Sequence, residues 1–185
     1  MSLRFIPNLI TGLRFLLVPP LVALLLDGRF GASLILFAFM GLSDAVDGFL
    51  AKRYGWHSRL GAFLDPLADK TMLVSAYLSL AWMGLLPVWF VAVIVVRDVV
   101  ILGGAIAYQL VVHGLEMQPS FLSKLNTVAQ IILVLAVILQ QLAVAPGWLV
   151  TVLIWLTFLS TVSSGLAYVL EWSRRTLRSL GKDAA

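Results

Sequence analysis

The chain has 185 residues, of which 61% are hydrophobic and only 12% are charged. A water-soluble fold of this length needs far more polar surface, so this composition excludes one. The net charge is +4, and the chain has no cysteine, which excludes disulfides, zinc–thiolate sites and thiol nucleophiles. The long apolar runs lack the alternation of barrel strands. We therefore expect an all-α protein that crosses a membrane several times.

Six apolar stretches reach about the 20 residues that a helix needs to cross a bilayer. In chain order they are Ile10–Leu26, Gly31–Leu50, Phe63–Leu85, Pro87–Val112, Leu122–Leu142 and Trp148–Leu170. The connections are short, so neighbouring helices are expected to pack antiparallel. No internal repeat stands out, and we expect one membrane domain over residues 1–185.

Basic residues are distributed unevenly between the two sides of the predicted bundle. The side that holds both termini and the second–third and fourth–fifth loops carries Arg4, Lys52, Arg53, Arg59, Lys124, Arg174, Arg175, Arg178 and Lys182. The opposite loops hold only Arg29. Basic residues concentrate on the cytoplasmic side of membrane proteins. We expect a bacterial cytoplasmic membrane, or a mitochondrial inner membrane, with both termini in the cytoplasm or matrix. A bacterium is favoured because no Arg/Ser-rich presequence stands at the start.

Four aspartates stand near the cytoplasmic ends of the second and third spans. Asp44 and Asp47 are three residues apart, and Asp65 and Asp69 are four apart, so each pair shares one helix face. If the two helices are neighbours, the four carboxylates converge at membrane depth. Ionisable groups inside a bilayer are costly and mark functional sites.

This density of carboxylate oxygens suits two hard cations, Mg²⁺ or Mn²⁺. Two such ions stabilise the attacking and leaving oxygens in a displacement at phosphorus. Two alternatives stay open. The acids can form buried ion pairs with Lys52, Arg53, Arg59 and Lys70. They can also line the pathway of a divalent-cation transporter, although the fifth and sixth spans carry no matching carboxylates.

The same stretch resembles the signature of the CDP-alcohol phosphatidyltransferase family. The matching positions read Asp44-x₂-Asp47-Gly48-x₂-Ala51-Lys52-x₈-Gly61-x₃-Asp65-x₃-Asp69. The spacing agrees throughout, and one position departs from the pattern. The family usually has Arg where this chain has Lys52, and a lysine loses the bidentate contact with phosphate.

The resemblance implies six transmembrane helices around a polar cavity open to the cytoplasm, in a homodimer. It implies that the four aspartates bind two divalent cations, and that Asp69 is also the general base that takes the proton of the acceptor hydroxyl. The residues implied around the cytidine diphosphate lipid are Asn8, Thr11, Arg14, Gly48, Ala51, Lys52 and Gly61. For Asn8 and Thr11, a plain interfacial helix start is an equal alternative.

Three basic residues are candidates for the acceptor site, namely Arg59, Arg97 and Lys124. Arg97 lies deep in the fourth span beside Asp98. A mutual pair is the alternative role, but consecutive residues of a helix do not face each other. We therefore predict that Arg97 contacts a phosphate of the acceptor.

Arg97-Asp98 and Ser123-Lys124-x-Asn126-Thr127 resemble the CMP-forming cardiolipin synthase branch of the family. The predicted reaction joins CDP-diacylglycerol and phosphatidylglycerol to give cardiolipin and CMP. The alternative is phosphatidylglycerophosphate synthesis from glycerol-3-phosphate, a branch that more typically has Arg-Glu and Gly-Lys-x-Lys-Thr. A neutral Asn126 fits a less charged acceptor. The expected partners are these lipids and a second copy of the chain, and no nucleic acid.

Overall fold

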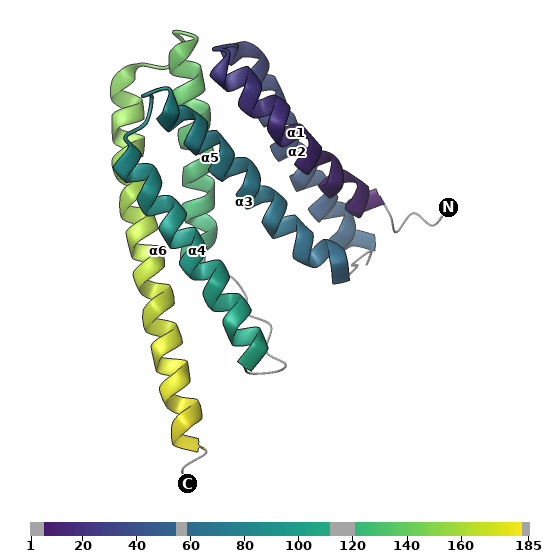
Figure 1. The fold of residues 1–185 in the computed structure, drawn as a ribbon, viewed down its shortest axis with the longest axis vertical. Helices are drawn as coiled ribbons and strands as arrows, with labels where there is room; N and C mark the ends of the chain where they lie inside the picture. Colours follow the sequence, from purple (N-terminus) through teal and green to yellow (C-terminus); the bar gives the residue numbers. More distant parts are fainter. Residues whose placement is uncertain (1–5, 55–58, 112–120, 183–185) are drawn as a thin grey trace. The chain divides into compact units, whose positions relative to one another are not determined.

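The computed structural model describes residues 6–54, 59–111 and 121–182 (Figure 1). Side chains are described within 12–43, 67–101, 103–104 and 121–170. This part of the chain forms six helices and no strand: α1 Ile6–Leu26, α2 Phe30–Tyr54, α3 Arg59–Trp82, α4 Val88–Val111, α5 Phe121–Gln141 and α6 Gly147–Lys182. The predicted all-α fold is confirmed, and each predicted span overlaps one helix, with different ends.

Two helical segments are long and apolar enough to cross a membrane, Phe121–Gln141 and Gly147–Leu170. They correspond to the predicted fifth and sixth spans. Two further apolar helical segments are shorter, Gly12–Leu26 and Phe30–Ser43. Six membrane crossings and a cavity open to the cytoplasm stay predictions.

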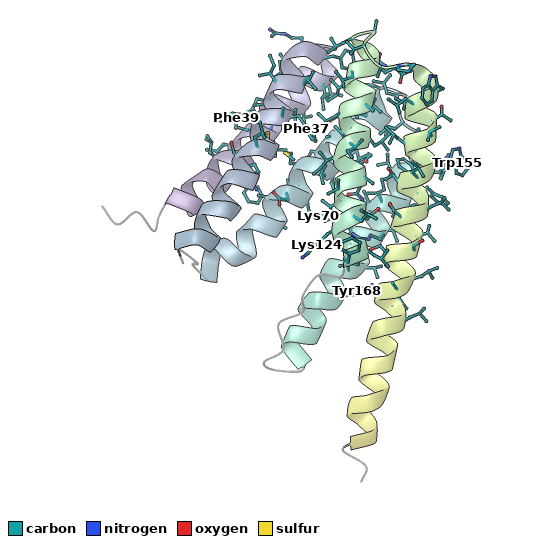
Figure 2. The ribbon with its side chains drawn as sticks, turned by 180° about the vertical axis from the view of Figure 1, so that it is seen from behind. Phe37, Phe39, Lys70, Lys124, Trp155 and Tyr168 are labelled. Carbon is teal, nitrogen blue, oxygen red and sulfur yellow. The ribbon has the colours of Figure 1, made fainter. Side chains whose placement is uncertain are left out.

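The first compact unit comprises residues 1–88 and 134–147, which include α1, α2 and α3. Within it, α1 packs against both α2 and α3 (Figure 1). Leu21 and Leu25 of α1 are fully buried four residues apart, and so are Ala76 and Leu80 of α3. Residues four apart lie on one helix face, which explains the contact between these helices. On α2, Phe37 is buried while Phe39 is exposed (Figure 2).

The second compact unit comprises residues 89–133 and 148–185, which include α4, the first part of α5 and α6. Trp89 at the start of α4 makes ring contacts with Trp155 and Phe158 of α6, with centroids 6.2 and 5.5 Å away. Further along, the Tyr168 hydroxyl of α6 donates to the carbonyl oxygen of Ile101 at 3.2 Å. The contacts follow the same order on both helices, so α4 and α6 run parallel (Figures 1 and 2).

Three of the described helices end in the same hydrogen-bonded turn. At the end of α1, the N–H of Gly28 donates to Leu25 and the N–H of Arg29 donates to Leu24. Gly84 occupies the equivalent position after α3, and Ala143 occupies it after α5. This turn requires a positive φ, which is 69° at Gly28, 74° at Gly84 and 56° at Ala143. Only glycine adopts such a φ without strain, so Ala143 is a strained residue.

Exchanging the residue types at these turns is expected to move stability in opposite directions. Gly84→Ala should lower the free energy of unfolding by about 1 kcal/mol, because a Cβ is disfavoured at positive φ. No heavy atom lies within 4 Å of the added Cβ, so a clash would not contribute. Ala143→Gly should raise the free energy of unfolding by up to about 1 kcal/mol. Thermal or chemical unfolding in detergent, followed by circular dichroism, measures both changes.

Gly41→Ala is the matched control, because Gly41 lies inside α2 and a Cβ added there also meets nothing within 4 Å. Alanine is the better helix former there, by roughly 0.5–1 kcal/mol. A Gly84→Ala protein as stable as the Gly41→Ala protein would contradict the strain account.

Candidate functional site

The backbone places the four predicted metal ligands on two helices. Asp44 and Asp47 lie in α2, and Asp65 and Asp69 lie in α3, with the predicted spacings on helical backbone. Of these four side chains, the structure describes that of Asp69. The other predicted residues whose side chains lie outside the described part are Asn8, Thr11, Gly48, Ala51, Lys52, Arg59 and Gly61. Their roles stay predictions.

Asp69 forms an ion pair with Arg14. Nη1 of Arg14, on α1, donates to Oδ1 of Asp69, on α3. The Arg14 side chain is 1% exposed, whereas the Asp69 side chain is 35% exposed. Two predicted site residues, 55 positions apart in sequence, are therefore brought together at the contact between α1 and α3. The alternative of purely structural ion pairs named Lys52, Arg53, Arg59 and Lys70 as partners of the acids, and Arg14 is not one of these residues.

Arg14 also reaches the helix that carries the other two predicted ligands. It lines a cavity of about 10 Å³ together with Leu13, Leu17, Phe39, Met40 and Ser43. Ser43 is the residue before Asp44, and its hydroxyl donates to the Phe39 carbonyl at 2.8 Å. The α1 helix thus brings one buried cation next to both acid-bearing helices. The sequence carries no signal for this arrangement beyond the polar residues Asn8, Thr11 and Arg14 around the start of the first predicted span.

Among the four predicted metal ligands, Asp69 is the one whose described side chain allows its fit to an ion to be tested. The side chains of residues 12–43, 67–101, 103–104 and 121–170 contain no group of three or more His, Asp and Glu residues that could hold an ion. Asp69 fits an oxygen-ligand site, because a third of its side chain is exposed outside the contact with Arg14. The metal site itself stays a prediction, because its other ligands lie outside this part.

A second buried polar cluster joins the three helices of the second unit. The Arg97 guanidinium donates to Asp98 Oδ1 at 2.8 Å and to Ser123 Oγ at 2.9 Å. It also donates to Ser164 Oγ. Arg97 is 7% exposed and Asp98 is 8% exposed. One arginine of α4 therefore ties α5 and α6 to its own helix.

The expectation that Arg97 and Asp98 do not pair is wrong. The rule about consecutive residues describes where the Cβ atoms point, whereas the guanidinium stands at the end of a long chain and folds back to the neighbouring carboxylate. A contact between Arg97 and the acceptor phosphate stays a prediction. The rule that consecutive helix residues do not face each other no longer supports it.

Asn126 is fully buried on α5 and is held by α6. Its Oδ1 accepts hydrogen bonds from Ser160 at 2.7 Å and from Thr161 at 2.9 Å. Within the described part of the chain, its Nδ2 has no hydrogen-bond partner. Lys124, two residues earlier, is exposed (Figure 2). Asn126 thus contributes to helix packing, and Lys124 remains accessible for a ligand.

A groove between α4 and α6 runs past this cluster. Its volume is about 400 Å³, and Arg97 and Thr161 contribute its polar groups. The rest of the lining is small or aliphatic and consists of Ala92, Val93, Val96, Val100, Val162, Gly165, Leu166 and Val169. The groove was not predicted from sequence, because its walls come from helices more than 60 residues apart.

The aspartate signature lies on two helices that follow each other in the chain, α2 and α3, and comparison with known proteins agrees with the family that the signature resembles. A sequence model of the family "CDP-alcohol phosphatidyltransferase" matches residues 4–163. This stretch includes α2 and α3 with all four aspartates. The chain belongs to the CDP-alcohol phosphatidyltransferase family.

Its relatives include members of both branches considered from sequence. A "probable cardiolipin synthase (CMP-forming)" of Drosophila melanogaster is 34% identical over 192 residues, which cover 92% of this chain and 58% of that protein. The "cardiolipin synthase (CMP-forming)" of Rattus norvegicus is 32% identical, covering 94% and 63%. This chain therefore spans about three fifths of their length. A "probable phosphatidylglycerophosphate synthase" of Mycobacterium tuberculosis is 32% identical, covering 94% and 82%.

Removing the guanidinium from the second unit is expected to destabilise it. Arg97→Met should lower the free energy of unfolding by about 3–5 kcal/mol, because it breaks a buried ion pair by removing one of its two charges. Ser123→Ala is the control, since it removes one of the hydrogen bonds of Arg97 and should lower the free energy by about 1 kcal/mol. Chemical unfolding in detergent measures both. An Arg97→Met loss no larger than that of Ser123→Ala would contradict the role of this ion pair.

Proposed function

We propose that this chain transfers a phosphatidyl group from CDP-diacylglycerol to an alcohol and releases CMP. The observation that carries this proposal is the complete aspartate signature on α2 and α3 inside the region matched by the family. The ion pair between Arg14 and Asp69 adds support, because it puts a buried guanidinium and a partly exposed carboxylate where the signature predicts chemistry.

In this mechanism, Asp69 acts as the general base. It takes the proton of the acceptor hydroxyl, whose oxygen then attacks the phosphorus that bears the diacylglycerol. The bond from that phosphorus to the bridging oxygen of CMP breaks, and CMP leaves with the electron pair. Two divalent cations, Mg²⁺ or Mn²⁺, held by Asp44, Asp47, Asp65 and Asp69, would supply positive charge for the diphosphate and the leaving group. General-base help of this kind contributes roughly 10²–10⁴ in rate.

The cytidine diphosphate lipid would lie along the signature. Gly48, Ala51 and Gly61 are small residues that permit a ligand to approach the backbone closely. Lys52 would supply a point charge to the diphosphate in place of the family's more common Arg. Asn8 and Thr11, on α1, are the further proposed contacts of the nucleotide.

We propose phosphatidylglycerol as the acceptor, with cardiolipin as the product. The names of the Drosophila and rat relatives support this choice. The fully buried Asn126 supports it as well, because it is neutral where the alternative branch typically has a lysine. Arg59, Arg97 and Lys124 are the proposed contacts of the acceptor phosphate. Phosphatidylglycerophosphate synthesis is the second candidate, supported by the Mycobacterium tuberculosis relative, of which the chain covers 82%.

We also propose that the chain works as a homodimer in a bacterial cytoplasmic membrane or a mitochondrial inner membrane. The support for a membrane is the two apolar helical segments of α5 and α6. The support for an active site facing the cytoplasm or matrix is the excess of Lys and Arg on the side that carries the signature.

The test uses the purified protein in detergent with CDP-diacylglycerol and Mn²⁺. Phosphatidylglycerol and glycerol-3-phosphate are offered separately, and CMP and the lipid products are measured by mass spectrometry. We expect cardiolipin from phosphatidylglycerol. Phosphatidylglycerophosphate alone would keep the transfer reaction and overturn the acceptor. A protein that releases no CMP with either alcohol but conducts Mn²⁺ into vesicles would be a transporter.

Replacing the proposed base is expected to remove the activity. Asp69→Asn should lower kcat by roughly 10²–10⁴, because an amide cannot accept the hydroxyl proton. Asp27→Asn is the matched control, since Asp27 is exposed in the turn between α1 and α2. Equal rates for the two variants would contradict the role of Asp69.

Removing the metal is expected to stop the reaction reversibly. Excess EDTA should abolish CMP release, and added Mg²⁺ or Mn²⁺ should restore it, because hard divalent cations suit a site made of carboxylate oxygens. Full activity after exhaustive chelation, with the remaining metal measured by mass spectrometry, would contradict a metal-dependent site.

A further inference from the structure

We propose that the groove between α4 and α6 holds an acyl chain of the acceptor phospholipid, and so favours a lipid acceptor over a small water-soluble one. The assignment to the acceptor rests on the proposed function, because it names the substrate class of the same reaction. Occupancy by a lipid chain rests on the groove itself, whose two walls belong to the same compact unit.

The dimensions of the groove fit a hydrocarbon chain. Its walls extend from Ala92 to Val100 on α4 and from Thr161 to Val169 on α6. At a rise of about 1.5 Å per residue, each wall is about 12 Å long. A volume of about 400 Å³ over this length leaves a mean cross-section of roughly 30 Å². An α-helix with its side chains is about 10–12 Å across and does not fit, whereas a single acyl chain does.

The walls of the groove are aliphatic and open to the surroundings. Val96 is 61% exposed on the α4 side, and Leu166 is 60% exposed on the α6 side. The α6 wall belongs to Gly147–Leu170, which is apolar and long enough to cross a membrane, and only 22% of its most apolar stretch is buried within the protein. Uncovered apolar surface of this kind is stable where hydrocarbon surrounds it. In the proposed membrane, lipid chains supply that hydrocarbon.

A glycine opposite Arg97 gives the groove its depth. A Cβ added to Gly165 would stand 3.5 Å from Cγ of Arg97. The missing side chain therefore leaves the aliphatic stem of Arg97 as part of the groove lining. The guanidinium at the end of this stem is held by Asp98, Ser123 and Ser164. One arginine thus presents an apolar stem to the groove and a charged head beside it.

Positive charge next to the groove indicates which lipid it takes. The hydrogen bond from Arg97 to Ser123 brings the start of α5 to the level of the groove. The next residue, Lys124, is exposed. A phospholipid with a net negative charge complements these two cations while its chain covers the aliphatic walls. Arg97 and Lys124 are also proposed contacts of the acceptor phosphate, so we assign the chain to the acceptor and not to CDP-diacylglycerol.

A chain in the groove gives phosphatidylglycerol a binding contribution that glycerol-3-phosphate cannot have. Each buried methylene adds to the affinity of the lipid, because apolar surface is removed from water. Glycerol-3-phosphate has no hydrocarbon chain to place there. The groove therefore acts as a specificity element for the acceptor, separate from the aspartates of α2 and α3.

The first experiment fills the groove from either wall with Val96→Phe and Val162→Phe. The KM for dioleoyl-phosphatidylglycerol, measured in phosphatidylcholine nanodiscs, should rise about tenfold or more, the scale of a misfit in a hydrophobic pocket. The KM for CDP-diacylglycerol and the kcat at saturating acceptor should stay unchanged. Val99→Phe is the matched control, because Val99 is 63% exposed on the same helix and does not line the groove.

Three outcomes of this experiment would overturn the proposal. The first is an unchanged KM for phosphatidylglycerol in both groove variants, and the second is an equal rise in the Val99→Phe protein. The third is a rise in the KM for CDP-diacylglycerol instead, which would give the groove to the donor lipid. A Val96→Phe protein that changes from dimer to monomer in light scattering would also overturn it, since the groove would then be a contact between copies.

A second experiment does not depend on turnover. Phosphatidylglycerol with a photoreactive diazirine in one acyl chain is cross-linked to the protein in the same nanodiscs, and the labelled residues are identified by mass spectrometry. We expect labels on the walls of the groove, fewer of them in Val96→Phe and the same number in Val99→Phe. Equal labelling by a phosphatidylcholine analogue would mean a non-selective surrounding lipid and would overturn the assignment.

The two proposals fail in different ways. An unmodified protein that releases no CMP but is labelled selectively by phosphatidylglycerol in the groove would refute the proposed function and keep the lipid site. An active protein that carries no label in the groove, and whose KM for phosphatidylglycerol is insensitive to Val96→Phe, would refute the groove proposal alone.

Discussion

A guanidinium buried among apolar helices must have a carboxylate within hydrogen-bond reach, and this constraint organises both units of the chain. In the first unit, the ion pair between Arg14 and Asp69 joins α1 to α3. In the second, Arg97 pairs with Asp98 and reaches serines of α5 and α6. Apolar contacts alone tolerate sliding of one helix along another, whereas these directional bonds favour one register. The same charges lie in or beside the regions where chemistry is proposed.

The helices could be predicted from hydropathy, but their ends could not. The sixth predicted span stops at Leu170, whereas α6 continues to Lys182. The second stops at Leu50, and α2 continues to Tyr54. Hydropathy detects the apolar part of a helix, and a helix continues into polar sequence wherever its backbone hydrogen bonds are satisfied. The turn after α5 was unpredictable for another reason, because Ala143 occupies a position that usually signals itself by glycine.

Part of the candidate site could likewise be predicted from the sequence, and part of it could not. The aspartate spacings predicted which helix faces carry the acids, because spacing along a helix determines a shared face. The partner of Asp69 could not be read from spacing, since Arg14 is 55 residues away and meets it through the packing of α1 on α3. For Arg97, the sequence led to a wrong prediction. A local rule excluded its pair with Asp98, and the length of the side chain overrides that rule.

The sequence separation within each ion pair has a consequence for the order in which the two pairs can form while the chain is synthesised and, as predicted, inserted into a membrane. An Arg or Asp at the centre of an inserting helix costs about 2.5–3.5 kcal/mol. Arg97 has its counter-ion on the next residue, so this charge is already paired within α4 before Ser123 and Ser164 have been made, and a predicted crossing by α4 would start from a neutralised pair. Arg14 can form its ion pair with Asp69 only after the ribosome has added 55 more residues. Relative to the synthesis of its arginine, the ion pair of the first unit is therefore completed later than the ion pair of the second unit.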